Sequence, residues 1–136
     1  MNCIENKEYD RWNKAKKKIN SINKDAICKK GQIWWCSVGK NVGVEQSCNN
    51  KNFVRPLLII KVFSSKMFLA VPITSKNKKK YSNNRFYYDL NRFEKIKGFA
   101  ILSQIKLFDN KRLVRKITKI DKFNLNLIII SIKKLF

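Results

Sequence analysis

The sequence contains no histidine, and only nine of its 136 residues are acidic. Without an imidazole, catalysis by a histidine acid or base is excluded. The cysteines form no CxxC pair, and a zinc site needs closely spaced Cys or His ligands, so we expect neither a metal nor another cofactor. The four cysteines are Cys3, Cys28, Cys36 and Cys48.

Long apolar runs are missing as well. The longest, residues 125–132, is too short and too interrupted to span a bilayer, so we expect no membrane association. No secretory signal peptide is visible, which predicts a cytoplasmic protein whose thiols stay reduced.

Positive charge dominates the composition. Thirty-one Lys and Arg side chains give a formal net charge of +22. A charge of this size attracts polyanions, either nucleic acid or an acidic protein segment. Lys, Asn and Ile are abundant together, as in proteins from AT-rich genomes, so drift in composition is the alternative explanation for part of the charge.

The first thirty residues predict a helix. Trp12, Ala15, Ile19 and Ile22 follow the three-to-four spacing of one apolar face, and the lysines between them mostly point elsewhere. We interpret this helix as an arm that packs on the rest of the protein. A basic arm that also touches nucleic acid is the alternative.

Short strands separated by polar loops follow the helix. Aromatic and β-branched residues predict strands at 32–38, 53–63, 67–73, 85–90 and 99–105. The run at 53–63 is almost continuously apolar and predicts a central buried strand, with Pro56 near its start where a missing N–H does least harm. Residues 38–52 and 75–84 predict loops, and a loop as long as the first is usually functional.

Apolar residues recur at helical spacing near the C-terminus and predict a helix with one apolar face. They are Ile117, Ile120, Phe123, Leu127 and Ile130. The whole pattern predicts a mainly β fold with terminal helices (α+β), in which one small closed barrel removes exposed sheet edges. We divide the chain into an N-terminal helical extension, residues 1–30, and a barrel domain, residues 31–136.

Several short segments stand in a fixed order between Gly31 and Ile120. They are 31–35 (GQIWW), 43–46 (GVEQ), 55–56 (RP), 71–75 (VPITS), 101–105 (ILSQI) and 109–113 (DNKRL). Together they resemble the MazF/PemK-like toxins of bacterial type II toxin–antitoxin modules. The resemblance implies a compact SH3-like barrel of the MazF/CcdB type and a metal-independent endoribonuclease.

Two residues inherit catalytic roles from this resemblance. In the family an Arg and a Thr form the cleavage site, and the matching positions are Arg55 and Thr74. An Arg just before a buried strand keeps its charge and must pair with a carboxylate or face a cleft, so a structural salt bridge is the alternative for Arg55. A Thr at a strand end is otherwise a cap or turn residue.

A third candidate is Glu45, which corresponds to the carboxylate of the family's Gly-Ser-Glu-Gln motif, although Val44 here replaces the serine. It would assist as a base or accept a hydrogen bond. We expect nearby polar and basic residues to contact RNA. The alternative for Glu45, Gln46 and the lysines is that they are only solvated loop residues. These RNA-binding candidates are Gln46, Ser75, Lys76, Lys78, Lys79 and Lys80.

Two further signals are less specific. Trp34 and Trp35 alternate sides of a strand, so we expect one to be buried and the other partly exposed. An exposed Trp could stack a base, and packing against the N-terminal helix is the alternative. Arg112 belongs to a segment whose arginine, by resemblance, pins a turn or a dimer contact.

The available groups leave one route to RNA cleavage. Without histidine or a metal cluster, the nucleophile must be the RNA's own 2′-OH, assisted by positioning and charge stabilisation. Such attack leaves a 2′,3′-cyclic phosphate and a 5′-OH, and it requires RNA because DNA lacks the nucleophile.

The resemblance also implies partners. They are single-stranded RNA bound across a homodimer interface and a cognate antitoxin whose acidic, partly disordered tail occupies the same groove. Two alternatives stay open: a nucleic-acid-binding barrel that has lost activity, and a gyrase poison of the CcdB type.

Overall fold

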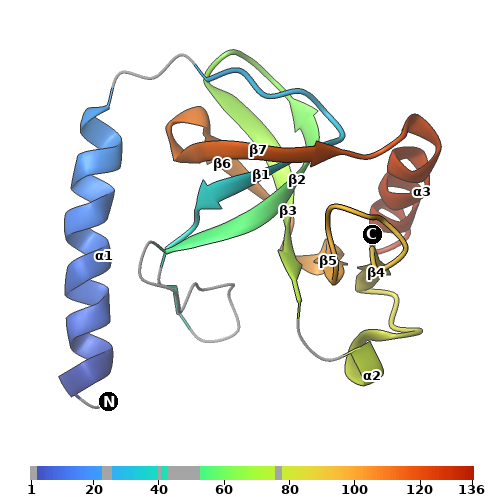
Figure 1. Cartoon of the computed structure of the whole chain (residues 1–136), viewed down its shortest axis with the longest axis horizontal. Coiled ribbons are helices and arrows are strands. Elements are labelled where there is room, and N and C mark those ends of the chain that lie inside the picture. The colour runs from blue at the N-terminus through green and yellow to red at the C-terminus, as the bar shows by residue number, and fades with distance from the viewer. Residues whose placement is uncertain (1–2, 23–25, 40, 43–52, 76–77) are drawn as a thin grey trace.

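The computed structural model of the chain describes residues 3–22, 26–39, 41–42, 53–75 and 78–136. Its elements run in the following order (Figure 1): α1 (Cys3–Ser21), β1 (Gln32–Ser37), β2 (Val54–Val62), β3 (Met67–Thr74), α2 (Lys78–Tyr81), β4 (Tyr87–Asp89), β5 (Phe99–Ile101), η1 (Leu102–Gln104), β6 (Lys106–Asp109), η2 (Asn110–Arg112), β7 (Leu113–Lys119) and α3 (Lys122–Lys133). The prediction of a mainly β fold with terminal helices is confirmed.

The strands form one curved antiparallel sheet centred on β2. This strand pairs with β1 on one side and β3 on the other, and β1 continues to β7. Strand β3 is shared between two neighbours, because its first half pairs with β6 and its last residues pair with β5. Strand β4 adds to β5 at the edge.

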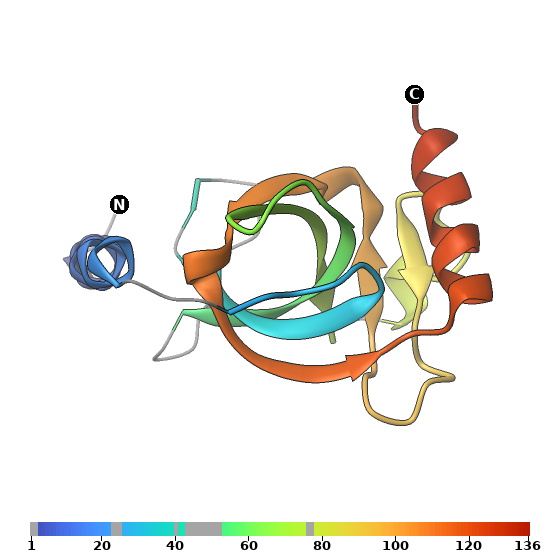
Figure 2. The same cartoon turned by 90° about the horizontal axis from the view of Figure 1, so that it is seen from above.

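The expected hydrogen-bonded closure of the barrel is not formed. The sheet order runs β4-β5-β3-β2-β1-β7, and within the described part of the chain its two ends do not pair. The sheet nevertheless curls strongly on itself (Figure 2). The chain itself bridges the gap, since β6 leads through η2 directly into β7. Buried Asn110 fixes this turn by donating to the Ala26 and Ser65 carbonyl oxygens at 3.1 and 2.7 Å.

Both faces of the central strand are buried, which explains its nearly continuous apolar sequence. Leu58 and Ile60 pack into the cluster that includes the buried face of α3, whereas Leu57 and Ile59 belong to a second cluster that includes Trp12 of α1. The predicted central buried strand is therefore confirmed, and each terminal helix completes one of the two cores.

Helix α1 packs on the sheet through Trp12, as predicted for an arm. The Trp12 side chain is only 5% exposed, and its ring contacts Phe53 at a centroid distance of 5.4 Å. Its other neighbour is Gly39, where a Cβ would come within 2.0 Å of Trp12 Cε2. A side chain at position 39 would thus push the helix off the sheet. Ile22, predicted to lie on the same face, is instead exposed beyond the helix end.

The C-terminal helix differs from its prediction. Ile117 lies in β7, because Asp121 begins the helix by accepting from Asn124 N at 3.0 Å. The Asn124 side-chain amide also donates to Asp121, at 2.6 Å, and this bond together with the backbone bond holds the pKa of Asp121 below its usual value. The predicted apolar face is also wrong, since Phe123, Leu127 and Ile130 are exposed. The buried face consists of Leu125, Ile128 and Ile132.

Smaller differences concern short elements. The predicted loop 75–84 contains helix α2, and the predicted strand 99–105 is divided into β5 and η1. Strands β6 and β7 were not predicted. No described helix is long and apolar enough to cross a membrane.

We expect Trp12→Ala to lower the free energy of unfolding by about 3–5 kcal/mol, because it removes a large buried ring and leaves a cavity under α1. Urea unfolding followed by circular dichroism measures the change. Lys14→Ala, an exposed substitution on the same helix, is the control and should stay within about 0.5 kcal/mol of the wild type. Equal midpoints for the two variants would show that α1 does not stabilise the sheet.

Candidate functional site

The ends of two neighbouring strands form a cavity of about 320 Å³. Strands β2 and β3 run antiparallel, with Leu57 opposite Pro72, so the start of β2 and the end of β3 meet at the same edge. Arg55 and Thr74, predicted from separate segments, are therefore brought into one site. The described lining residues are Trp35, Val54, Arg55, Pro56, Ile73, Thr74, Ser75, Ile96 and Lys97.

Arg55 is held at the entrance of β2. Its backbone is opposite Cys36 of β1, and its Nη1 donates to the Ile73 carbonyl oxygen at 3.2 Å. This bond ties the guanidinium to the residue directly before Thr74. Since an arginine stays protonated in a protein, the cavity keeps a fixed positive charge.

Thr74 is the last residue of β3, and its side chain is only 7% exposed. Its backbone pairs with Phe99, and its carbonyl oxygen lies against Gly98. Gly98 has a φ of +114°, and a Cβ there would come within 2.1 Å of that oxygen. Glycine at position 98 therefore allows the close approach that places Thr74 at the cavity wall.

Lys97 is a site residue that the sequence did not reveal. Its Nζ donates to the Asn91 carbonyl oxygen at 2.8 Å, and the Asn91 side chain accepts from Gly98 N at 3.0 Å. These bonds hold the segment that carries Ile96 and Lys97 over the strand ends. The described lining residues thus include two cations and no carboxylate.

The two tryptophans lie on different sides of β1, as predicted, but the expected burial of one of them is wrong, because both are partly exposed. Trp34 packs against the cluster that contains Trp12, and its Nε1 donates to the Gln32 side chain at 2.9 Å. Trp35, opposite Pro56, lines the cavity. Trp35 is therefore the one of the pair that is placed to contact a ligand.

An aromatic stack lies one strand away from Thr74. Tyr81 of α2 stacks on Tyr87 at a centroid distance of 4.0 Å and meets the edge of Phe99, the β5 partner of Thr74. Burial, followed by the proximity of Tyr81, raises the pKa of Tyr87. The phenol of Tyr87 therefore stays protonated at neutral pH. No sequence pattern indicated this stack, because it forms across a turn.

The remaining candidates fall into two groups. Ser75 is exposed and lines the cavity, whereas Lys80 is exposed on α2 with its Nζ over the Tyr81 ring and is not among the lining residues. Glu45, Gln46 and Lys76 lie outside the described residues, as do the side chains of Lys78 and Lys79.

Arg112 is hydrogen-bonded to the end of β1 and does not line the Arg55 cavity. Its Nη1 donates to the Ser37 carbonyl oxygen at 3.0 Å, and its guanidinium lies over the Trp12 ring. Burial lowers the pKa of Arg112. Its contacts join β1, η2 and α1.

The curved, open antiparallel sheet with a helix at each end and a cavity at the ends of β2 and β3 defines a small, mainly β protein with a MazF-like fold. Residues 29–136 match the PemK-like, MazF-like toxins of type II toxin–antitoxin systems, and the chain belongs to this family. No curated protein sequence matches it significantly.

Solved structures of low sequence identity share the fold. A MazF crystal structure from Deinococcus radiodurans superposes with a TM-score of 0.64 at 18% identity, covering 82% of this chain and 97% of that one. A mycobacterial endoribonuclease in complex with its cognate antitoxin gives a TM-score of 0.60 at 14% identity, covering 79% and 92%. A MazE–MazF complex from D. radiodurans gives 0.58 at 15%, covering 82% and 96%.

We expect Gly98→Ala to destabilise the protein by about 1–3 kcal/mol, because the new methyl group overlaps the Thr74 carbonyl and the backbone has a positive φ. Denaturant unfolding measures the loss. Gly31→Ala is a matched control, since Gly31 also has a positive φ (+85°) but a Cβ there meets its neighbours at 3.4 Å or more. Gly98→Ala should cost more than the control, and equal losses would show that the contact with Thr74 is unimportant.

Proposed function

We propose that the protein is the toxin of a type II toxin–antitoxin module and acts as a metal-independent, sequence-selective endoribonuclease on single-stranded RNA. The observation that carries the proposal is the shared cavity of Arg55 and Thr74 in a chain of this toxin family. The structural similarity to a mycobacterial endoribonuclease supports it.

The proposed reaction uses the RNA's own hydroxyl group. The 2′-oxygen bonds to phosphorus, the bond from phosphorus to the 5′-oxygen breaks, and the products are a 2′,3′-cyclic phosphate and a 5′-OH. The 2′-OH proton passes to Glu45 or to water, and the departing 5′-oxygen takes up a proton. The reaction needs no metal-bound water.

Arg55 and Thr74 stabilise the charge that grows on the phosphorane oxygens. The Arg55 guanidinium is fixed by its bond to Ile73, so little reorganisation is required when that charge develops. The Thr74 hydroxyl, at the buried end of β3, donates to the same group. Lys97 adds a second cation at the cavity.

RNA contacts outside the reacting phosphate come from polar, basic and aromatic groups. Trp35 offers a face for base stacking beside the cavity. The proposed polar and basic contacts are Gln46, Ser75, Lys76, Lys78, Lys79 and Lys80.

The proposed partners are inferred from membership of this toxin family. We infer a cytoplasmic homodimer that is neutralised by a cognate antitoxin with an acidic segment. The crystallised complexes of a mycobacterial endoribonuclease with its antitoxin and of MazE with MazF support the antitoxin partner. The net charge of +22 favours an acidic segment over a neutral one.

Arg55→Ala should slow RNA cleavage by at least about 10²-fold, because it removes a preorganised charge donor. Arg55→Lys should recover only part of the rate, since an ammonium cannot reproduce the planar fork. Single-turnover cleavage of labelled RNA measures both, and circular dichroism confirms the fold. Near wild-type cleavage by Arg55→Ala would place the site elsewhere.

An RNA with one 2′-deoxy nucleotide at the cleavage position should bind normally and resist cleavage, because the phosphates are unchanged while the nucleophile is gone. Wild-type protein should cut the unmodified RNA equally well in excess EDTA. Gel analysis of end-labelled strands measures both results. Cleavage of the modified strand at the same bond would rule out attack by the 2′-OH.

A further inference from the structure

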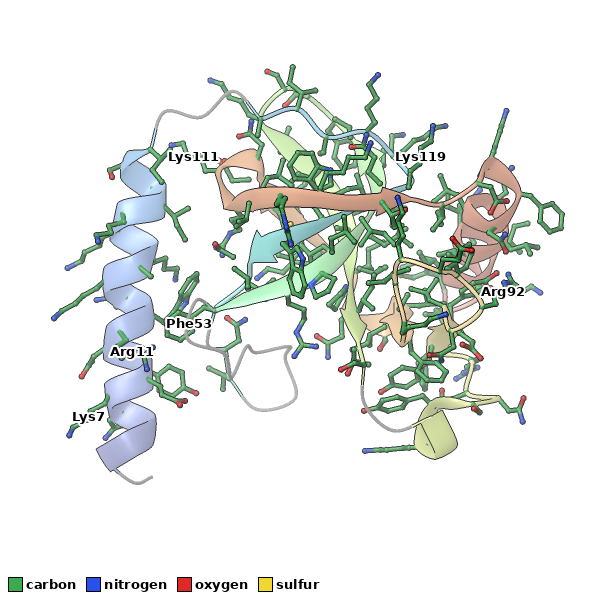
Figure 3. All side chains as sticks on the ribbon, viewed as in Figure 1. Lys7, Arg11, Phe53, Arg92, Lys111 and Lys119 are labelled. Carbon is green, nitrogen blue, oxygen red and sulfur yellow. The ribbon has the colours of Figure 1, made fainter. Side chains whose placement is uncertain are left out.

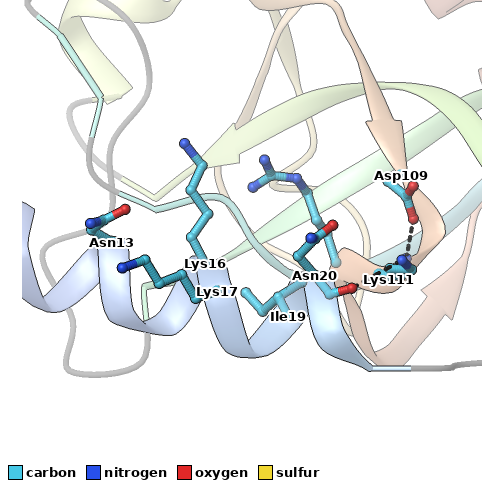
Figure 4. A pocket seen from close by; sticks show the side chains of 8 residues that line it. Asn13, Lys16, Lys17, Ile19, Asn20, Asp109 and Lys111 are labelled. Carbon is cyan, nitrogen blue, oxygen red and sulfur yellow. Dashed lines mark hydrogen bonds between the residues drawn. The ribbon is translucent and has the colours of Figure 1, made fainter.

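A second cavity lies between the C-terminal half of α1 and the η2 turn (Figure 4). Its volume is about 340 Å³, and we call it the helix groove. The described residues that line it are Asn13, Lys16, Lys17, Ile19, Asn20, Asp109, Lys111 and Arg112. None of them lines the Arg55 cavity, and those of α1 precede the part of the chain that matches the family.

The helix presents one polar flank to this groove. Residues 13, 16, 17 and 20 follow the spacing of a single helix face, next to the face on which Trp12 is buried. Lys16 and Lys17 are exposed there. Lys14 and Lys18, equally exposed on α1, are not among the lining residues and fall on the opposite flank.

The opposite wall carries two cations whose positions are fixed. Lys111 Nζ donates to the Asn20 carbonyl oxygen at 3.1 Å, near the C-terminal end of α1 where a cation is favourable. Arg112 is anchored on Ser37 and Trp12. The one acidic lining residue, Asp109, accepts from Lys111 N at 2.8 Å and acts electrostatically on Arg112. Four cations against one carboxylate leave the groove positive.

A buried aromatic pair, Trp12 and Phe53, lies between the groove and the Arg55 cavity, and each side chain is only 5% exposed. Phe53 directly precedes Val54, which lines the Arg55 cavity, and its ring contacts Trp12. Figure 3 shows Arg11 and Phe53 near each other between α1 and β2, and the Arg11 guanidinium lies 5.3 Å from the ring centroid. On the other side of this junction, Arg112 covers Trp12. Two cations therefore flank the buried pair, Arg11 on the side of Lys14 and Lys18 and Arg112 on the side of the groove.

We infer that the helix groove binds backbone phosphates of the RNA strand at nucleotides beyond the cleavage position; this inference rests on the proposed function. A strand that leaves the Arg55 cavity on the side of Arg112 reaches the groove, because Arg112 both lines the groove and covers the Trp12 ring beside Phe53. Lysine and arginine side chains neutralise phosphates, and the amides of Asn13 and Asn20 add hydrogen-bond donors. The N-terminal helix thus lengthens the RNA site in addition to packing on the sheet.

The test compares two double variants of equal charge, Lys16→Ser with Lys17→Ser and Lys14→Ser with Lys18→Ser. The probe is RNA with a 2′-deoxy nucleotide at the cleavage position, in a short form and in a form extended on either side. Fluorescence anisotropy across a salt series gives Kd. Each lost phosphate contact should reduce the slope of log Kd against log salt by about 0.7, so the groove variant should lose about 1.4.

The expected result has two parts. The wild type and the control variant gain affinity when the RNA is extended, whereas the groove variant gains less and shows the reduced slope. Identical behaviour of the two variants would overturn the inference. So would a groove-dependent affinity for polyglutamate without one for RNA, which would assign the groove to an acidic polypeptide. Cleavage of unmodified RNA by the wild type, measured separately, tests the proposed function on its own.

Discussion

The antiparallel pairing of β2 with β3 is the constraint on which the site depends. The turn at residues 64–66 closes this hairpin, where Phe63 N donates to the Met67 carbonyl oxygen at 3.1 Å. Because the pairing continues to Leu57 opposite Pro72, the far ends of both strands meet at one edge. Arg55 and Thr74 are thus brought together by backbone hydrogen bonds and by the apolar residues buried on both faces of β2. A slip of one residue would turn the side chains of one strand to the opposite face.

A second junction joins α1 to this framework. The Trp12 ring fills the space that Gly39 leaves open, contacts Phe53 and lies under Arg112. Phe53 itself accepts hydrogen bonds from Val38 N and Gly39 N through its carbonyl oxygen, at 3.0 and 3.1 Å. The start of β2, the end of β1 and the helix therefore share one packed cluster, so the position of the helix is coupled to the segment that carries Arg55.

The sequence was enough to predict the structural features that depend on local residue patterns and on the β2–β3 hairpin. The family resemblance assigned Arg55 and Thr74 to one site, and the predicted turn between two apolar strands is the hairpin that brings them to one edge. Lys97 could not be predicted, because its place depends on Gly98 fitting against Thr74 and on the Asn91 amide. The buried face of α3 could not be chosen either, since apolar residues occur all around that helix. The predicted closure of the sheet was wrong, because β6 and β7 are connected by the chain through η2 and not by strand pairing.

The charges divide into two kinds with different physical effects. Arg55 is partly buried and fixed by a backbone bond, so its field acts in a lower dielectric and on one position. The exposed lysines of α1 act through solvent and are screened by salt. On the proposed function, a cation distant from the reacting phosphate interacts equally with the bound strand and with its transition state. Such cations raise affinity and leave turnover unchanged, whereas Arg55, at the position where charge develops, changes turnover itself.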